Sequence, residues 1–333
     1  MNLFEMAEST QMKAVFVEEF GGAENMKIKT DAPVPRVVAG KVLVRLHAAG
    51  INELELRIRS RGWRGFITPF VLGMDGAGVV ETVGDGVMTC KPGDRVYVCQ
   101  PITGTYAEYC LADADRVYKL HDKLSFEEGA LLPIPYFSAL RALTRAHFQR
   151  GDSVLVQGAS GAVGLAAVQL ARGLGASRVF GTAGSERGRQ IVREMGADDV
   201  FDYKERDFKE TVKAAIGPKG VNVILETNVD VNFHFDLEIV SKHGHIVIVG
   251  KRGITSCDPQ EMVTKESTVT GSALFFCDTE ARLDMHDTLY RGVEEGWLKP
   301  YIGGRFKLDD VIASHRDIET RSGATGKTVL TIE

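Results

Sequence analysis

Residues 155–176 read LVQGASGAVGLAAVQLARGLGA and are the most specific local signal in the chain. A short apolar run leads into a turn that carries Ala159, Gly161 and Gly164, and an amphipathic segment of helical periodicity follows. A side chain at Gly161 would hold the backbone away from a pyrophosphate, Gly164 permits close packing of helix on sheet, and the helix N-terminus offers free N–H groups. The order predicts a dinucleotide-binding turn; a plain tight turn is the alternative.

Apolar runs and helical segments alternate around this turn. The alternation predicts a parallel sheet with right-handed crossovers, a doubly wound domain from residue 127 to residue 276. The expected strands are SVLVQG (153–158), RVFGTAG (178–184), DVFDY (199–203), VNVILETN (221–228), HIVIVG (245–250) and TVTGSALFF (268–276). The expected helices are residues 164–176, 186–197, 207–217 and 235–244.

Residues 12–125 show a different pattern, with short β-rich runs broken by glycine and proline. They predict a compact, mostly antiparallel β domain. Residues 277–333 hold helical segments and a last strand, and we expect them to return to the first domain. The predicted organisation is therefore one domain of residues 1–126 and 277–333, a second of residues 127–276, and a cleft between them.

Composition excludes several classes of protein. The chain has 333 residues, 44% of them hydrophobic, and a formal net charge of -5, which is ordinary for two globular domains and offers no overall footprint for nucleic acid. No apolar run is long enough to span a bilayer, and residues 1–11 do not resemble a signal peptide. The five cysteines include no C-x-x-C pair, which favours a reducing compartment, so we expect a cytoplasmic protein without a membrane anchor.

The end of the second expected strand bears on the choice of dinucleotide. An NAD site usually has an acidic residue there, whereas residues 181–185 read GTAGS. The missing carboxylate leaves room for a 2′-phosphate, which Arg187, Arg189, Tyr203 and Lys204 can approach, so NADPH is the predicted cofactor. Solvated positions for these cations are the alternative, and Glu186 between them would repel a phosphate.

These motifs together resemble the zinc-free quinone oxidoreductases, or zeta-crystallin-like proteins, of the medium-chain dehydrogenase/reductase superfamily. The resemblance implies a GroES-like β domain and a Rossmann domain, and it covers nearly the whole chain from Met12. It is carried by residues 49–60 (AGINELELRIRS), 72–87 (LGMDGAGVVETVGDGV), 91–97 (KPGDRVY), 104–112 (GTYAEYCLA), 134–143 (IPYFSALRAL), 156–172 (VQGASGAVGLAAVQLAR), 181–188 (GTAGSERG), 247–253 (VIVGKRG) and 315–330 (HRDIETRSGATGKTVL).

Zinc-dependent relatives carry a cysteine where Asn52 stands and a histidine where Met74 stands, so we expect no metal. An acceptor must then already be electrophilic, as a quinone or an α,β-unsaturated carbonyl is. By resemblance, Asn52 and Ser138 are the candidate catalytic residues that hydrogen-bond the acceptor oxygen. Structural roles are the alternative: a helix cap for Asn52, and a bond to a carbonyl one turn back for Ser138.

The resemblance also implies which residues contact the cofactor, and the sequence departs from the family at the position of Arg57. Relatives tend to carry a tyrosine where Arg57 stands, which would reshape the acceptor pocket unless Arg57 turns outward to Glu53 or Glu55. The implied cofactor-binding residues are Ser160, Gly161, Ala162, Val163, Gly164, Gly184, Arg187, Tyr203, Lys204, Asn232, Val249, Gly250, Lys251, Arg252, Ser272, Ala273, Leu274 and Arg321.

The leading hypothesis is an NADPH-dependent, metal-free reductase of ortho- or para-quinones, and the enzyme alternative is an alkenal or enone reductase. A third interpretation is a cofactor-binding protein with a structural or RNA-binding role, for which Arg57, Arg59, Arg61 and Arg64 would supply a basic patch. The strand at residues 268–276 has few charges for a sheet edge, and with the resemblance it predicts a homo-dimer or homo-tetramer.

Overall fold

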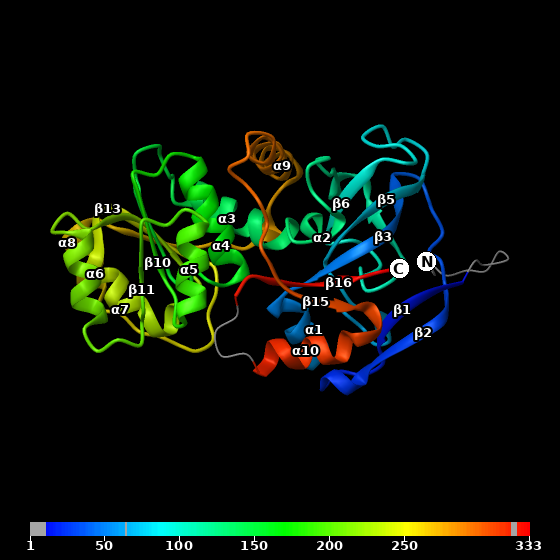
Figure 1. The fold of residues 1–333 in the computed structure, drawn as a ribbon, viewed down its shortest axis with the longest axis horizontal. Helices are drawn as coiled ribbons and strands as arrows, with labels where there is room; N and C mark the ends of the chain where they lie inside the picture. Colours follow the sequence, from blue (N-terminus) through cyan, green and yellow to red (C-terminus); the bar gives the residue numbers. More distant parts are fainter. Residues whose placement is uncertain (1–10, 64, 321–324) are drawn as a thin grey trace. The chain divides into compact units, whose positions relative to one another are not determined.

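The computed structural model describes residues 11–63, 65–320 and 325–333 of the chain (Figure 1). Among these, residues 11–134, 299–320 and 327–333 form one compact unit. Residues 135–298 and 325–326 form a second one. The sequence predicts boundaries at 126 and 276, whereas these two units divide the chain after residues 134 and 298.

The first unit is built on antiparallel strands, as its pattern of short β-rich runs predicts. A seven-stranded sheet has the order β15-β16-β3-β5-β6-β8, with β7 paired to β3, and a three-stranded sheet has the order β2-β1-β4. All of these pairs are antiparallel except β15 with β16. The strands are β1 (Gln11–Val17), β2 (Met26–Pro33), β3 (Lys41–Ile51), β4 (Phe70–Val71), β5 (Asp75–Val83), β6 (Arg95–Cys99), β7 (Tyr109–Asp113), β8 (Val117–Lys119), β15 (Ile302–Lys307) and β16 (Lys327–Thr331).

The centre of this sheet is the pair β3–β5, where the chains approach closely. A Cβ built on Gly78 would lie 1.9 Å from the carbonyl oxygen of Arg45, so only glycine fits there. Three helices accompany the sheet: α1 (Glu53–Arg61), α2 (Phe126–Gly129) and α10 (Val311–Thr320). Because α1 directly follows β3, the residues at its start are anchored to the central strand.

The second unit is a doubly wound parallel sheet of order β11-β10-β9-β12-β13-β14. Figure 1 shows α4 and α5 on one face and α6, α7 and α8 on the other. Both faces are therefore covered, which explains why Val154, Leu155 and Val156 in β9 are fully buried. The strands are β9 (Ser153–Val156), β10 (Arg178–Thr182), β11 (Asp199–Phe201), β12 (Val221–Glu226), β13 (Val240–Ile248) and β14 (Thr268–Gly271). The helices are α3 (Pro133–Arg145), α4 (Ala162–Gly173), α5 (Glu186–Glu194), α6 (Phe208–Ile216), α7 (Val229–Ile239), α8 (Pro259–Lys265) and α9 (Thr279–Glu294).

Two details of the second unit correct the sequence prediction. The helix expected at residues 235–244 begins at Val229 and ends at Ile239, because β13 already starts at Val240. The unit extends past residue 276 because the ring of Trp297, just after α9, lies against Gly173 of α4. A Cβ on Gly173 would lie 2.2 Å from that ring, so this glycine makes room for the tryptophan that fastens α9 to the unit.

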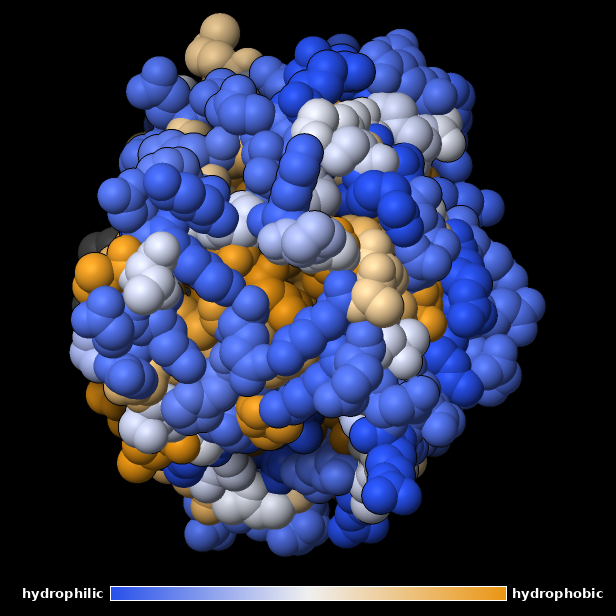
Figure 2. Space-filling model, turned by 90° about the vertical axis from the view of Figure 1, so that its left-hand side faces the viewer, coloured by the Kyte–Doolittle hydropathy of each residue, from blue (hydrophilic) through white to orange (hydrophobic). Residues whose placement is uncertain are grey.

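The surface of the side on which α6 and α8 lie is largely hydrophilic, with hydrophobic side chains visible in the gaps (Figure 2). Beneath it, Phe233, Phe235 and Leu237 of α7 are buried in the core that packs on the sheet. Among the described residues, no helix combines the length and the apolar character that crossing a membrane requires.

Candidate functional site

The turn between β9 and α4 has the geometry of a phosphate-binding loop. Gly158 has φ +70°, a left-handed conformation that favours glycine, and its N–H donates to Oγ1 of Thr182 at 3.0 Å. Gly164 is required by packing, because a Cβ there would lie 2.4 Å from the carbonyl oxygen of Gly158. The turn is also fixed from outside, since the N–H of Gly326 donates to the carbonyl of Ser160 at 2.8 Å.

Gly161 differs from the other two glycines of the turn. It is the residue before α4 and has φ -72°, which any residue adopts, and the nearest atom to a Cβ built there is 3.5 Å away. The protein itself therefore leaves room for a side chain at this position. A glycine at this position is explained if a ligand occupies the space, and backbone N–H groups at the start of α4 would bind a pyrophosphate there. These residues fit a dinucleotide.

Most of the other predicted cofactor residues follow the carboxyl ends of neighbouring strands. Parallel strands present these ends at one edge of the sheet, where such folds bind their ligands. Backbone contacts hold the edge together: the N–H groups of Val249 and Gly250 donate to the carbonyl of Glu226, and that of Ser272 donates to Ile248. The structure thus places at this edge Ser160, Ala162 and Val163 after β9, Gly184 after β10, Val249, Gly250, Lys251 and Arg252 after β13, and Ser272, Ala273 and Leu274 after β14.

Asn232 lies near this edge but on α7, where its amide donates to Oε1 of Glu226 at 3.3 Å. Gly184 and Tyr203 lie side by side, since a Cβ on Gly184 would be 2.3 Å from the tyrosine hydroxyl. Arg187 in the first turn of α5 and Lys204 after β11 are both exposed. Arg321, the last predicted cofactor residue, lies outside the described residues.

Arg189, which the sequence also offers to a 2′-phosphate, has other partners. Its guanidinium pairs with the carboxylates of Asp202 and Glu186. Of the three cations considered at the sequence level, Arg187 and Lys204 therefore remain as candidates for an anionic ligand. The carboxylate of Glu186 forms ion pairs with Arg189 and Arg193.

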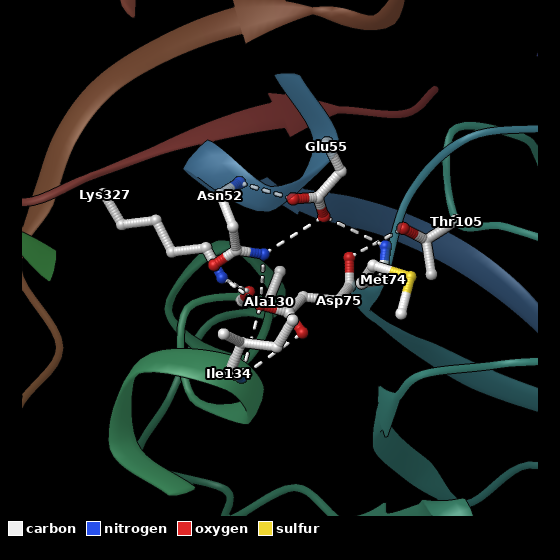
Figure 3. Close-up of polar contacts among 8 residues, drawn as sticks. All are labelled: Asn52, Glu55, Met74, Asp75, Thr105, Ala130, Ile134 and Lys327. Carbon is white, nitrogen blue, oxygen red and sulfur yellow. Dashed lines mark hydrogen bonds and ion pairs between the residues drawn. The ribbon is translucent and has the colours of Figure 1, made fainter. Parts of the chain in front are cut away.

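In the first unit, Asn52 belongs to a buried polar cluster (Figure 3). It precedes α1, and its side-chain amide nitrogen donates to Oε1 of Glu55 at 3.1 Å and to Oδ2 of Asp75 at 3.0 Å. Both amide hydrogens are therefore directed at carboxyl groups. In this structure both donors of the Asn52 side chain are used within the protein, and its other polar atom, Oδ1, can only accept.

Glu55 and Asp75 are each fully buried, and Lys327 from β16 forms an ion pair with Asp75. Burial raises the pKa of Glu55 to about 7, the charge of Asp75 contributes to the rise, and Lys327 opposes it. Backbone N–H groups of Asn52 and Met74 donate to the Glu55 carboxyl at 3.0 and 3.1 Å. The cluster therefore holds Asn52 and Met74 in fixed positions next to one another.

Met74 and Asn52 occupy the positions where zinc-dependent relatives carry ligands, and their thioether and amide are a poor donor set for zinc. Within residues 11–63, 65–320 and 325–333, no three histidine, cysteine or acidic side chains gather to hold a metal ion. Ser138 is half-buried on α3 in the second unit.

The basic patch considered for RNA binding is wrong in one member. Arg59 is buried, and its guanidinium pairs with Glu319 and donates to the carbonyl of Gly21 at 2.7 Å. Arg64 lies outside the described residues. The spacing of the arginines in α1 does not show which of them is buried. Because Arg59 is buried and paired, it adds no charge to a basic surface patch.

The sequence reasoning missed the buried charged residues that organise both units. A signal was present: Glu226 ends the apolar run VILE, Asp236 lies between Phe235 and Leu237, and Lys327 begins the strand KTVLT. Charged residues inside apolar segments are rarely buried unless they are paired or protonated.

Comparisons with known proteins agree with this architecture. Residues 38–122 match the family described as alcohol dehydrogenase GroES-like domain, and residues 162–288 match the family described as zinc-binding dehydrogenase. The chain is 44% identical over 321 residues to the quinone oxidoreductase of Homo sapiens, covering 96% of this chain and 97% of that one. It is 42% identical over 322 residues to the quinone oxidoreductase of Sus scrofa, again covering 96% and 97%.

Solved structures give the same result. A mycobacterial protein complexed with NADPH superimposes with a TM-score of 0.86 at 29% identity, covering 96% of this chain and all of that chain. An NAD-dependent alcohol dehydrogenase superimposes with a TM-score of 0.87 at 31% identity, covering 97% and 100%.

A GroES-like unit and a Rossmann unit with a glycine-rich turn define a medium-chain dehydrogenase/reductase, an oxidoreductase that uses a nicotinamide cofactor. Within that superfamily the chain belongs to the zeta-crystallin-like quinone oxidoreductases.

Proposed function

We propose that the protein is an NADPH-dependent, metal-free reductase of ortho- and para-quinones. The observation that carries this proposal is the open position at Gly161, where the protein leaves space that a side chain could fill and a pyrophosphate would use. The names of relatives at 41–44% identity support a quinone as the acceptor.

NADPH, when bound, supplies the reducing equivalents for the acceptor. The chain contributes the pyrophosphate-binding turn at residues 158–164 and the carboxyl edge of the sheet, with Val249, Gly250 and Ser272 among the residues that would hold the nicotinamide. Ser138 is the proposed donor to the acceptor oxygen, because its hydroxyl can supply the hydrogen bond that Asn52 directs at carboxyl groups.

Selectivity for NADPH is proposed to come from the ends of β10 and β11. The strand β10 is followed by Ala183 and Gly184, with no carboxylate to bind a ribose 2′-hydroxyl. Exposed Arg187 and Lys204 supply positive charge where a 2′-phosphate would lie. Because solved relatives of this fold include both an NADPH complex and an NAD-dependent enzyme, the fold alone does not decide between the two.

The proposed assembly is a homo-dimer or homo-tetramer. β14 is the edge strand of the six-stranded sheet, and its residues are half-buried or exposed in the single chain. Phe276, shortly after it, is 66% exposed. A second copy of the chain would cover this edge.

The test is turnover in the presence of NADPH or NADH, with a para-quinone, an ortho-quinone or an α,β-unsaturated aldehyde as acceptor. NADPH oxidation that depends on a quinone is the expected result. Turnover of the aldehyde without turnover of either quinone would replace this proposal with an enone reductase.

Selectivity is tested with Arg187→Ala, for which Arg193→Ala on the same helix is the matched control. Loss of a charge-assisted contact at an exposed site predicts that Arg187→Ala raises the Kd of NADPH about tenfold and leaves that of NADH unchanged. If both variants bind NADPH like the unmodified protein, Arg187 is not a phosphate ligand.

A further inference from the structure

Two carboxyl groups of the second unit face each other in its core. Glu226 ends β12, Asp236 lies on α7, and both side chains are fully buried. Among the described residues, no donor reaches Oε2 of Glu226 or Oδ2 of Asp236. Burial, the charge of Glu226 and a hydrogen bond with Glu226 raise the pKa of Asp236, so each of the two groups acts on the protonation of the other.

A shared proton resolves the arrangement. Two ionised carboxylates in contact would repel each other and leave both inner oxygens without a donor, whereas one proton satisfies both. Burial raises the pKa of Asp236 well above its ordinary value, and the charge of Glu226 adds to the rise. Burial also raises the pKa of Glu226. Both shifts favour a state in which the two carboxyl groups together hold one proton.

The outer oxygen of each group is fixed by donors. Oε1 of Glu226 accepts from the backbone N–H of Asn228 and from the side-chain amide of Asn232. Oδ1 of Asp236 accepts from Nε2 of Gln157 at 2.8 Å. These donors fix the orientation of both carboxyl groups. A shared proton would therefore lie between the two remaining oxygens, Oε2 of Glu226 and Oδ2 of Asp236.

From Asp236 the hydrogen bonds continue to the phosphate-binding turn. Oε1 of Gln157 accepts from the hydroxyl of Thr182 at 2.9 Å, and that hydroxyl oxygen accepts from the N–H of Gly158 at 3.0 Å. Gln157 and Thr182 are 1% and 2% exposed, so water does not compete for these contacts. In this series of hydrogen bonds Gly158 donates to Thr182, Thr182 donates to Gln157, and Gln157 donates to Asp236.

The charged groups on neighbouring elements either have other partners or add negative charge near the two carboxyl groups. Asp230 on α7 raises the pKa of Glu226 further and accepts from the backbone N–H of Arg252. On α6, Lys213 pairs with Glu238, and on α8, Lys265 donates to the carbonyls of Leu237 and Glu238. On β13, burial lowers the pKa of His245, which keeps that ring neutral.

We infer that Glu226 and Asp236 are positioning residues of the dinucleotide site: they share one proton and, through Gln157 and Thr182, hold Gly158 in the conformation that binds the pyrophosphate. The inference rests on the proposed function, because it takes the turn as the NADPH site. When the pH rises far enough, the proton leaves to solvent, the two carboxylates repel each other, and Asp236 no longer fixes Gln157. NADPH affinity then falls.

The experiment compares the full-length protein with Asp236→Asn, Glu226→Gln and Asp236→Ala. The two amide variants place a permanent N–H donor where the shared proton lies and preserve the charge of the singly protonated pair. Asp236→Ala removes the acceptor for Gln157. Glu238→Gln, on the solvent side of the same helix, is the matched control. The readouts are the Kd of NADPH from pH 6 to pH 10, infrared difference spectra of the carboxyl groups, and amide exchange of residues 155–165.

We expect the Kd of NADPH to rise with pH for the unmodified protein and Glu238→Gln, and to stay flat for the two amide variants. Loss of a buried acceptor predicts that Asp236→Ala binds NADPH about tenfold more weakly at every pH. The infrared band of a protonated carboxyl should be present at pH 7 and absent from both amide variants. Amide exchange in residues 155–165 should be faster in Asp236→Ala.

Two results would overturn the inference: no protonated carboxyl in the unmodified protein at pH 7, or amide variants that follow the same pH profile as the unmodified protein. Failure of the proposed function has a different signature. In that case NADPH binds at no pH, while the infrared band and the amide exchange still report whether the pair shares a proton and holds the turn.

Discussion

Glu55 and Asp75 in the first unit and Glu226 and Asp236 in the second are both buried carboxyl pairs, but their charge is compensated differently. Lys327 pairs with Asp75 across 252 positions of sequence. In the described part of the second unit, no ion pair reaches Glu226 or Asp236, and the proposed compensation is a shared proton. The comparison teaches that a cation lets a buried pair release its proton near neutral pH, whereas a pair without one retains it to higher pH.

The largest effect should come from removing the cation of the first pair. Lys327→Met leaves the buried carboxyl groups without positive charge, which is expected to cost about 3–5 kcal/mol of unfolding free energy. Denaturant titration at pH 7.5 measures it, with Lys299→Met, at an exposed lysine, as the control. Equal stability of the two variants would show that Lys327 does not compensate the pair.

The second effect is a pH dependence that Glu55 imposes. Its pKa rises from an ordinary value of 4.5 to about 7 on folding, so the folded state binds more protons between these limits. The unfolding free energy contributed by this group is complete below pH 4.5 and falls by about 3 kcal/mol as the pH rises through 7. Glu55→Gln should remove this slope in denaturant titrations across that range. An unchanged slope would assign the dependence to other groups.

The smallest effect should come from the second pair. Glu226→Gln supplies an amide hydrogen where the shared proton lies, so its unfolding free energy at pH 7 should stay within about 1 kcal/mol of the unmodified protein. The measurement is the same denaturant titration. A loss as large as that expected for Lys327→Met would mean that Glu226 is ionised and that the two pairs do not differ.

Much of the fold could be predicted because its signals are local. The alternation of strands and helices from residue 153 onward predicted the parallel sheet, and the order of strand, turn and helix at residues 155–176 placed Gly161 in the turn. The helix itself begins at Ala162, two residues earlier than predicted. Local patterns do not show that the second unit extends to residue 298, because Trp297 packs against Gly173, which is far away in the sequence.

The buried polar clusters could not be predicted for the same reason. Nothing near Asn52 in the sequence shows that its amide nitrogen also donates to Asp75, since Asp75 comes from another strand. Arg59 has the same spacing as Arg57, which is half-buried, and Arg61, which is exposed, yet it is buried because Glu319 and the carbonyl of Gly21 lie beside it. Local sequence patterns predict helices and strands. Whether a charged side chain is buried depends on partners from distant segments of the chain.

The central claim is that the turn at residues 158–164 binds NADPH, and fluorescence titration of the unmodified protein and of Gly161→Ala with NADPH tests it most directly. The added methyl group fits the protein at 3.5 Å from its nearest neighbour, so the fold should persist, as circular dichroism can check. We expect the unmodified protein to bind NADPH and Gly161→Ala to bind it at least about tenfold more weakly, since the methyl group occupies the space of the pyrophosphate. Equal affinity of the two proteins, or no binding by either, would contradict the account.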